Sequence, residues 1–320
     1  MSQECSVATR VQILKDRSIM LGHARHFFHE RAIQEVDCPC LSRYASVDAH
    51  IDLIPVALTV EAGKKEEAYL HSSPEYGMKR LLAEGIGDIY QLSHVFRDGE
   101  YGSRHNPEFM MAEWYRVGLP FEKMIAETVD FVRLFVGQRP CRIMSYKEAF
   151  MEYAGFDPYT ISDEALQDHV TALALHAHDE LRDDMLTRCM AMNIEHHLGA
   201  EDICVIAYYP PTQAALAKTC MHEGNLVAER FEVYYKGIEL ANGYHELQDA
   251  KEQLKRLEEA NRLRQEYGKE KLAIDMRFIV ALEKGIPECS GVAVGFDRLM
   301  MLRHHKEALS GVVPFDWSVS

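Results

Sequence analysis

The first long periodic stretch of the chain, residues 18–31, predicts a helix. Its apolar side chains recur at helical spacing, at Ile19, Ala24, Phe27 and Phe28. Residues 33–39 break this spacing and are typical of a strand that enters a turn. Residues 51–60 predict a second strand, and a polar loop follows over residues 61–67.

The next helix has clear start signals. Ser73 suits the N-cap, Pro74 suits the first helical position, and Glu75 lies favourably at the positive end of the helix dipole. We therefore expect a helix that begins at this Ser-Pro-Glu sequence.

Strand-like and helical patterns then follow each other in blocks. Residues 89–96 and 109–117 are rich in apolar and aromatic residues and are joined by a charged loop, which predicts a hairpin. The later blocks are helical over 145–199, strand-like over 203–209 and 226–240, helical and highly charged over 252–271, and strand-like over 291–295 before an apolar helix at 299–302.

This order of blocks predicts an α+β fold. A helix, antiparallel strands, a helical segment, more strands and a closing helix differ from the regular strand–helix alternation of a Rossmann fold. No repeat and no Pro/Gly/Ser-rich linker divides the chain. We expect a single domain over residues 1–320, with a helical insertion at about 145–200.

Composition narrows the class of protein. The 320 residues are 47% hydrophobic and 27% charged, which excludes a disordered chain. Asp and Glu outnumber Lys and Arg by 50 to 35, and the formal charge of −15 excludes a non-specific polyanion binder. The eight cysteines are scattered without a CxxC pair, no apolar run has membrane-spanning length, and the N-terminus lacks a signal-peptide pattern. We expect a reduced, cytoplasmic protein that does not enter membranes.

Several common catalytic motifs are missing from the sequence. The chain has no GxxxxGK[ST], HExxH or GxSxG motif and no GxGxxG after a strand, so a nucleotide must be held in another way. The helical segment carries four histidines, His176, His178, His196 and His197. They lack cysteines or carboxylates at metal-ligand spacing, which favours packing or surface roles over a metal site.

Two acidic residues flank an Asn-Gly pair. Asn242-Gly243 between strand-like runs is a strong signal for a two-residue hairpin turn, which would place Glu239 opposite Glu246. Facing carboxylates repel each other, so one must bind a proton or a cation must lie between them, and Mg²⁺ prefers such oxygen ligands. Alternatively, both acids extend into water. The residues alone leave these interpretations open.

A second polar group lies in and beside the predicted hairpin of residues 89–117. Arg97, Arg104, His105 and Phe109 have the chemistry to hold a phosphate and stack a base. By composition alone, an exposed charged hairpin is the simpler interpretation.

These residues resemble signature motifs of the class II aminoacyl-tRNA synthetases. Phe96-Arg97, followed by His105 and Phe109, resembles motif 2. Residues 291–298, Gly-Val-Ala-Val-Gly-Phe-Asp-Arg, resemble motif 3. The resemblance implies the class II catalytic core, an antiparallel sheet flanked by helices.

The remaining motifs point to one branch of this family. Residues 31–39 resemble motif 1, the family's dimer-forming helix and strand, with Ala32 in place of the usual glycine. Residues 73–75, 104–109 and 237–243 are similar to the lysyl-specific branch. The match runs through nearly the whole chain in the family's order.

Two departures redirect the implied function. Motif 1 begins within the first few dozen residues, which leaves no room for the anticodon-binding barrel of lysyl-tRNA synthetases. Ala293 stands where those enzymes usually have glycine, and its methyl group narrows the pocket around the substrate's α-amino group. Both features resemble the truncated paralogues that attach (R)-β-lysine to a lysine of elongation factor P.

The resemblance implies two chemical steps, activation of the amino acid by ATP as an adenylate and transfer of the acyl group to the acceptor lysine. It also implies a homodimer, Mg²⁺ as cofactor, elongation factor P as partner and no binding of tRNA. Two other functions stay open. One is a minimal lysyl-tRNA ligase or stand-alone lysine-activating enzyme. The other is an inactive synthetase-like sensor, although the ATP-site residues of motifs 2 and 3 are retained.

Position by position, the resemblance makes Arg97 and Arg298 the implied catalytic residues, because they would neutralise phosphate charge in the transition state. ATP would be bound by Arg97, Asp98, Gly99, His105, Asn106, Phe109, Glu239, Leu240, Gly295 and Arg298. The amino acid would be bound by Ser73, Pro74, Glu75, Tyr115, Asn242, Glu246 and Ala293. Mg²⁺ would be bound by Glu239 and Glu246.

One position departs from motif 2. The family usually has Glu two residues after the motif 2 arginine, where this chain has Gly99, and Glu100 comes next. Either Glu100 fills that role through a shifted loop, or the contact to adenine is lost.

Overall fold

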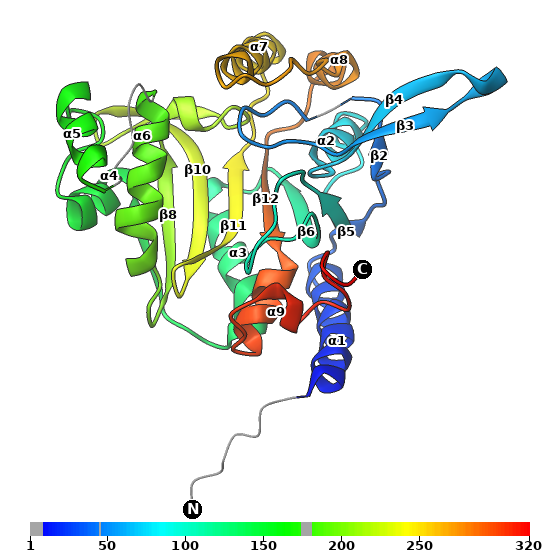
Figure 1. The fold of residues 1–320 in the computed structure, drawn as a ribbon, viewed down its shortest axis with the longest axis horizontal. Coiled ribbons are helices and arrows are strands. Elements are labelled where there is room, and N and C mark those ends of the chain that lie inside the picture. The colour runs from blue at the N-terminus through cyan, green and yellow to red at the C-terminus, as the bar shows by residue number, and fades with distance from the viewer. Residues whose placement is uncertain (1–8, 45, 174–180) are drawn as a thin grey trace, which may run out of the picture.

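The computed structural model describes residues 9–44, 46–173 and 181–320. A large sheet forms its centre, with the strand order β1-β5-β6-β12-β11-β10-β8-β7 and β9 paired to the start of β10 (Figure 1). Its strands are β1 (Gln34–Glu35), β5 (Ile89–Phe96), β6 (Glu108–Val117), β7 (Cys141–Ser145), β8 (Ile203–Tyr209), β9 (Thr219–His222), β10 (Asn225–Tyr235), β11 (Ile238–His245) and β12 (Cys289–Gly295).

The central strands of this sheet pair antiparallel, and only the terminal pairs β1–β5 and β7–β8 of the described sheet are parallel. The predicted hairpin over residues 89–117 is confirmed as β5 and β6, with Phe96 opposite Glu108. An antiparallel centre with helices on its faces matches the predicted α+β class.

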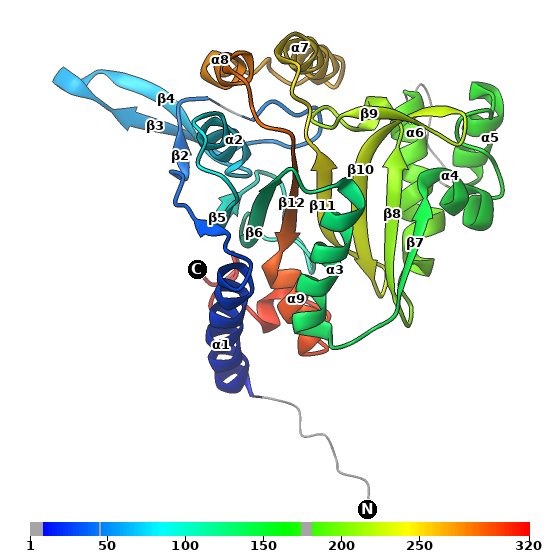
Figure 2. The same ribbon diagram turned by 180° about the vertical axis from the view of Figure 1, so that it is seen from behind.

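Three helices cover the back of the sheet: α1 (Arg10–His29), α3 (Phe121–Val136) and α9 (Phe296–Arg303). Figure 2 shows α3 in front of the central strands, and α3 packs against β10, β11 and β12. The core between these layers contains fully buried aromatic side chains, including Phe28, Trp114, Phe131 and Phe296. This packing leaves the opposite face of the sheet available for a site.

Helix α1 is longer than predicted and ends in a strained turn. It begins at Arg10, where Thr9 and Gln12 form a capping box. After its end, Ala32 has a φ of 54°. This left-handed conformation is one that glycine adopts at no cost, so the backbone explains why the related motif 1 usually has glycine here.

A second helical layer lies at one end of the sheet and consists of α2 (Glu75–Ala83), α7 (Ala250–Glu266) and α8 (Met276–Lys284) (Figure 1). Helix α2 begins at Glu75, one residue later than predicted, with Pro74 and not Ser73 at the N-cap. The Ser73 hydroxyl still accepts a hydrogen bond from the Glu75 amide at 3.0 Å. Tyr76 stacks on Phe278, with ring centroids 4.3 Å apart, and joins α2 to α8.

The predicted helical segment follows β7 and packs on the other edge of the sheet. It contains α4 (Tyr146–Ala149), α5 (Asp163–Leu173), α6 (Arg182–Cys189) and short π- and 3-10-helical turns, with its own apolar cluster against β8. His176 and His178 lie outside the described residues. Within the described ranges, histidines and carboxylates close enough to share an ion occur at His26, His29 and Glu30, on the exposed end of α1.

A small three-stranded sheet, β2 (Leu41–Ser42), β4 (Lys65–Leu70) and β3 (Pro55–Thr59), extends from the body as an arm (Figure 1). The predicted loop over residues 61–67 is therefore too long, because β4 begins at Lys65. The first residues of β4, Lys-Glu-Glu, are polar like those of a loop, although their side chains alternate between exposed and partly buried positions.

The predicted hairpin turn at Asn242-Gly243 is wrong. Both residues lie inside β11, which pairs with β10 on one side and β12 on the other. The turn is at Lys236-Gly237, where both residues have positive φ, 52° and 66°, as a type I′ turn requires. Gly243 serves packing instead, since a Cβ there would lie 2.5 Å from the Phe231 ring.

The seven cysteines in the described ranges are all free, and Cys5 lies outside those ranges. Among the helices of the described chain, none is both long and apolar enough to span a membrane.

Candidate active site

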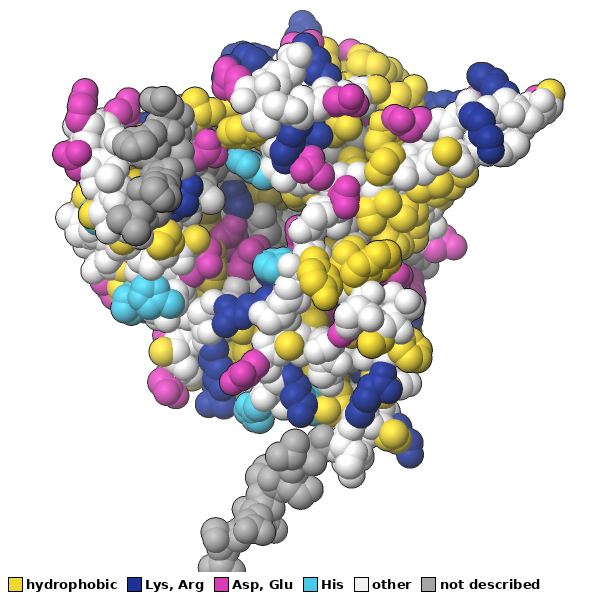
Figure 3. All heavy atoms as spheres, in the orientation of Figure 1, with side chains coloured by type: hydrophobic (Ala, Val, Ile, Leu, Met, Phe, Trp, Pro, Cys, Tyr) yellow, Lys and Arg dark blue, Asp and Glu magenta, His cyan; other side chains and the backbone are white. Residues whose placement is uncertain are grey.

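A cavity of about 420 Å³ lies on the open face of the sheet, a size typical of small-molecule sites. Figure 3 shows this hollow with acidic side chains at its bottom. Strands β6, β10, β11 and β12 supply its floor, and α2 and the loop before β3 close one side.

The cavity brings together most of the residues predicted from the motifs. Of the predicted ATP-binding residues, it is lined by Arg97, His105, Asn106, Phe109, Glu239, Leu240, Gly295 and Arg298. Of the predicted amino-acid-binding residues, it is lined by Ser73, Glu75, Tyr115, Asn242, Glu246 and Ala293. Residues from both ends of the sequence therefore converge on one site, although contact with a substrate stays a prediction.

Three predicted residues do not line the cavity: Pro74, Asp98 and Gly99. The Asp98 amide instead donates to the main-chain oxygen of Asp52 at 2.9 Å, and Gly99 is exposed with a φ of 73°. Glu100 does face the cavity, and its carboxylate accepts from Arg97 at 3.3 Å. The shifted-loop alternative for Glu100 therefore agrees with the geometry.

One part of the cavity is built to hold an anion beside an aromatic ring. The Arg97 guanidinium lies 5.1 Å from the Phe109 ring centroid, and its Nε is buried without a hydrogen-bond partner among the described residues. Arg298 donates to the main-chain oxygen of Glu239 and contacts His105 Nε2, both at 2.9 Å. Burial and the Arg298 charge lower the pKa of His105, so its imidazole is neutral at physiological pH.

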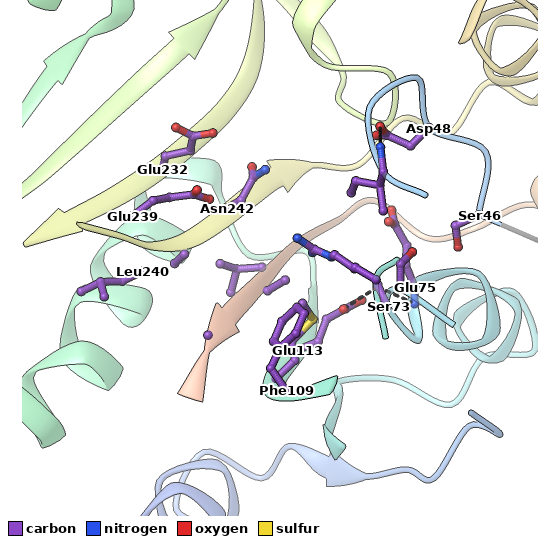
Figure 4. A pocket seen from close by; sticks show the side chains of 18 of the residues that line it. Ser46, Asp48, Ser73, Glu75, Phe109, Glu113, Glu232, Glu239, Leu240 and Asn242 are labelled. Carbon is purple, nitrogen blue, oxygen red and sulfur yellow. Dashed lines mark hydrogen bonds between the residues drawn. The ribbon is translucent and has the colours of Figure 1, made fainter. Parts of the chain in front are cut away.

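Glu239 and Glu246 do not face each other, contrary to the hairpin prediction. Glu239 lies in β11 and Glu246 directly after its end, and both line the cavity. Their joint binding of Mg²⁺ stays a prediction. The neighbour of Glu239 is Glu232 on β10 (Figure 4). The Glu239 side chain is 39% exposed to the cavity, but surrounding protein limits its hydration. This desolvation and the Glu232 charge raise the pKa of Glu239.

Glu232 is held in place by three donors. The hydroxyls of Tyr209 and Tyr234 each donate to its carboxylate at 2.5 Å, and Arg230 pairs with it. Arg230 also donates to the Asn242 side-chain oxygen at 3.2 Å. The amide nitrogen of Asn242, a donor without a hydrogen-bond partner in the part of the chain that the structure describes, can serve a ligand in the cavity.

A second part of the cavity is a buried acidic pocket. Glu113 is 2% exposed and accepts from the hydroxyls of Ser73 at 2.7 Å and Tyr115 at 2.8 Å (Figure 4). Desolvation, followed by the charge of Glu75, raises the pKa of Glu113 to about 8. A buried acid of this kind is suited to bind a cation.

A buried lysine ties two further acids of this pocket together. Lys79 Nζ lies 2.6 Å from Glu75 Oε1 and 2.6 Å from Glu246 Oε2, and both Lys79 and Glu246 are 1% exposed. Desolvation raises the pKa of Glu246 to about 7, and Lys79 opposes that rise. Lys79 therefore fixes the positions of both carboxylates.

The predicted small residue of motif 3 lies between these two parts. Ala293 is opposite Glu113 on one neighbouring strand and Asn242 on the other, and it lines the cavity. Its methyl group occupies space next to the acidic pocket, as the sequence predicts.

A family model described as "tRNA synthetases class II (D, K and N)" matches residues 5–317. The chain belongs to this family. The assignment confirms the resemblance of the three motifs and the class II fold.

Curated relatives of this class II chain share one name. Proteins called elongation factor P–(R)-beta-lysine ligase from Haemophilus ducreyi and Pasteurella multocida are each 41% identical over 307 residues, and that from Avibacterium paragallinarum is 42% identical over 307 residues. Each alignment covers 95% of this chain and 94–95% of the relative.

Four charged residues of the class II site were missed by sequence reasoning: Lys79, Glu113, Arg230 and Glu232. A signal existed for Glu113, because it is the single carboxylate in the apolar run of residues 109–117 and must be buried with partners. Glu232 shares its strand with Glu229 and lacks this signal. Lys79 lies four residues after Glu75, the spacing of a helical ion pair. Arg230 has no comparable signal.

Replacing Lys79 by methionine is expected to destabilise this class II fold by about 3–5 kcal/mol, because Glu75 and Glu246 would lose a buried counter-ion. Urea unfolding followed by circular dichroism measures the change. Lys147→Met removes the half-exposed ion pair with Asp157 and should leave the unfolding midpoint nearly unchanged. Equal midpoints for the two variants would show that Lys79 contributes little.

The acidic pocket is expected to make amino-acid binding pH-dependent. With a pKa of about 8, Glu113 is protonated at neutral pH in the empty site and loses its proton when a cation binds. The KM for a cationic amino acid should therefore fall as pH rises from 6 to 8, by at most tenfold per pH unit. Amino-acid-dependent pyrophosphate exchange measures this KM, and Glu113→Gln should flatten its profile. An unchanged slope in the variant would assign the titration to another group.

Proposed function

We propose that this class II chain activates (R)-β-lysine with ATP and transfers it to a lysine of elongation factor P. The observation that carries the proposal is the shared name of relatives about 41% identical over 95% of the chain. The cavity supports it, because it combines an arginine-lined, aromatic part with a buried acidic pocket. An inactive sensor of an amino acid would not need the arginine-lined part in addition to the acidic pocket.

The proposed first step forms an acyl-adenylate. The substrate carboxylate oxygen attacks the α-phosphorus of ATP, the bond to the β-phosphate oxygen breaks, and pyrophosphate leaves. Arg97 would hold the α-phosphate and the attacking carboxylate, and Arg298 would hold the γ-phosphate. Adenine would stack between Phe109 and Arg298, with His105 beside the phosphates.

The proposed second step forms an amide. The deprotonated ε-amine of the acceptor lysine attacks the adenylate carbonyl, AMP leaves with the bonding electron pair, and the amine loses a proton. Water must be kept from the adenylate until the acceptor arrives, and the cavity walls would do this.

Recognition of the amino acid rests on its two ammonium groups. Glu75, Glu113 and Glu246 would bind them, and Asn242 would donate to the carboxylate. Ala293 would narrow the space beside the α-carbon and so favour the β-amino acid, whose amine is one carbon further along.

Glu232 and Glu239 are a further pair of acids that suits Mg²⁺, beside the predicted pair of Glu239 and Glu246. Neighbouring carboxylates offer the hard oxygen donors that Mg²⁺ prefers, and desolvation followed by the charge of Glu232 raises the pKa of Glu239. Bound there, the ion would neutralise ATP phosphate charge.

We further propose a homodimer formed through α1 and the turn at Ala32, and a location in the cytoplasm with the translation factor. The motif 1 resemblance supports the first point, and the reduced cysteines support the second.

The deciding experiment is the intact mass of purified elongation factor P after incubation with the enzyme, ATP and either (R)-β-lysine or α-lysine. We expect the mass to rise by one lysyl group, mainly with the β-isomer. Preferred exchange with α-lysine together with charging of tRNA would contradict this and favour a minimal lysyl-tRNA ligase. Absence of pyrophosphate exchange with either isomer would favour the sensor.

A further inference from the structure

One wall of the acidic pocket is a loop without helix or strand, residues 46–52. Ser46, Val47, Asp48 and Ile51 all line the cavity. Figure 4 shows Ser46 and Asp48 next to Glu75 and Ser73. The loop therefore borders the part of the cavity proposed to hold the amino acid.

Two of the loop's hydrogen bonds are local. The Asp48 carboxylate accepts from the amides of His50 at 2.7 Å and Ile51 at 3.0 Å, which shapes a turn. The Val47 amide donates to the Tyr76 hydroxyl of α2 at 3.3 Å, and a bridge joins Asp52 to Asp98 in the motif 2 loop. These contacts set the loop's shape and join its first part to α2, and other contacts attach the rest of the loop.

Those other contacts come from the end of α7, more than 200 positions away. Arg264 is 5% exposed and donates to the main-chain oxygens of Asp48 at 3.0 Å and Ile51 at 3.2 Å. It also lies 3.1 Å from the Asp52 carboxylate, and its Nε donates to the main-chain oxygen of Glu270 at 3.0 Å.

Lys269 reinforces this attachment. Its ammonium lies 2.8 Å from the Asp52 carboxylate and within 3.4 Å of the main-chain oxygens of Ala49 and His50. The loop thus offers four carbonyl oxygens and one carboxylate to two cations of α7 and the turn after it. Arg264 is the buried one, and a planar guanidinium with several fixed donors holds a loop more rigidly than a flexible ammonium.

We propose that Arg264 is a positioning residue for amino-acid binding. It does not line the cavity itself but holds residues 46–52 against the acidic pocket, so that the loop completes the wall around the amino acid and its adenylate. The inference rests on the proposed function for the identity of the amino acid. It assigns to α7, which the sequence presents as a highly charged helix, a part in substrate selection.

Because the loop borders the acidic pocket, loss of the Arg264 contacts should act on the amino acid more than on ATP. In pyrophosphate exchange, Arg264→Gln is expected to raise the KM for (R)-β-lysine about tenfold or more, because hydrogen bonds from a charged group contribute an effect of about this size. The KM for ATP should rise less than twofold. Without acceptor protein, it should also release AMP faster, because water reaches the adenylate.

The matched control is Arg262→Gln, two residues away on the same helix. Arg262 is half-exposed and pairs with Glu259 and Glu266, so both KM values should stay at those of the unaltered enzyme. Arg264→Lys retains the charge but not the fork of donors and should give an intermediate KM. If Arg264→Gln behaves like Arg262→Gln, or raises both KM values equally, the proposal is wrong.

A second variant decides the case if Arg264→Gln does not fold. Asp52→Asn weakens the ion pairs to Arg264 and Lys269 while the carbonyl contacts remain, so it should raise the same KM by a smaller factor. An unchanged KM would overturn the proposal. Failure of the proposed function is recognised separately, because the unaltered enzyme would then show no exchange with either lysine isomer.

Discussion

Replacement of Arg298 by alanine is expected to reduce ATP–pyrophosphate exchange by a factor of about 10² to 10³ or more. Charge develops on the phosphates in the transition state, and loss of one preorganised donor in a water-poor site has an effect of this size. The variant also loses the contacts of Arg298 with His105 and with Glu239, so the residues around the triphosphate would be less ordered.

The effect should be catalytic and not a result of unfolding. Arg303→Ala is the matched control, since Arg303 is on the same helix and pairs with Asp16 at 2.6 Å, away from the cavity. We expect that variant to retain exchange activity. Thermal unfolding checks that both variants are folded. Exchange by Arg298→Ala within tenfold of the unaltered enzyme would remove Arg298 from the proposed machinery.

Gly291→Ala is expected to abolish activation of the amino acid. A Cβ at this position would lie 2.4 Å from Glu246 Oε1 and 2.4 Å from Tyr115 Cε1, far closer than atoms tolerate. Neither neighbour can move easily, because Lys79 holds Glu246 and the Tyr115 hydroxyl is bonded to Glu113. The added methyl group should therefore distort the acidic pocket and destabilise the fold by about 1–3 kcal/mol.

Pyrophosphate exchange at a range of (R)-β-lysine concentrations measures this effect, with urea unfolding alongside. Gly22→Ala is the control for stability, because nothing within the chain lies within 4 Å of a Cβ at this position of α1, so its free energy of unfolding should not fall. ATP should still raise the melting temperature of folded Gly291→Ala, since the arginine-lined part is separate. Normal exchange by this variant would show that the pocket can expand.

Helices and strands of this fold could be predicted from the sequence where the apolar residues follow one clear pattern. The strands at residues 89–96 and 203–209 have the predicted bounds, because runs rich in apolar residues and their flanking turns leave one interpretation. The strand at residues 238–245 was misread, because Asn-Gly has the chemistry of a turn. Only the tertiary structure reveals that Gly243 is needed where the Phe231 ring crosses it.

Sequence reasoning could predict those residues of the site that belong to recognisable motifs. Conspicuous residues such as Arg97 and Arg298 were found, and the structure brings them into one cavity. The pairing of acids was not predictable, because it depends on register. A turn at Lys236-Gly237 instead of Asn242-Gly243 pairs Glu239 with Tyr234 and not with Glu246, and places Glu232 close to Glu239. A local signal cannot settle such long-range register.

The buried lysine of the acidic pocket has a consequence for stoichiometry. Glu75, Glu113 and Glu246 carry three negative charges when ionised, and Lys79 cancels one of them. Two negative charges are left, the number needed to neutralise a substrate with two ammonium groups. A monoamine would leave one buried carboxylate unmatched or protonated. In the proposed function, Lys79 would thus set the net charge of the empty pocket. A diamino acid would be preferred over a monoamine because it neutralises that charge, and the shape of the pocket would then distinguish the isomers.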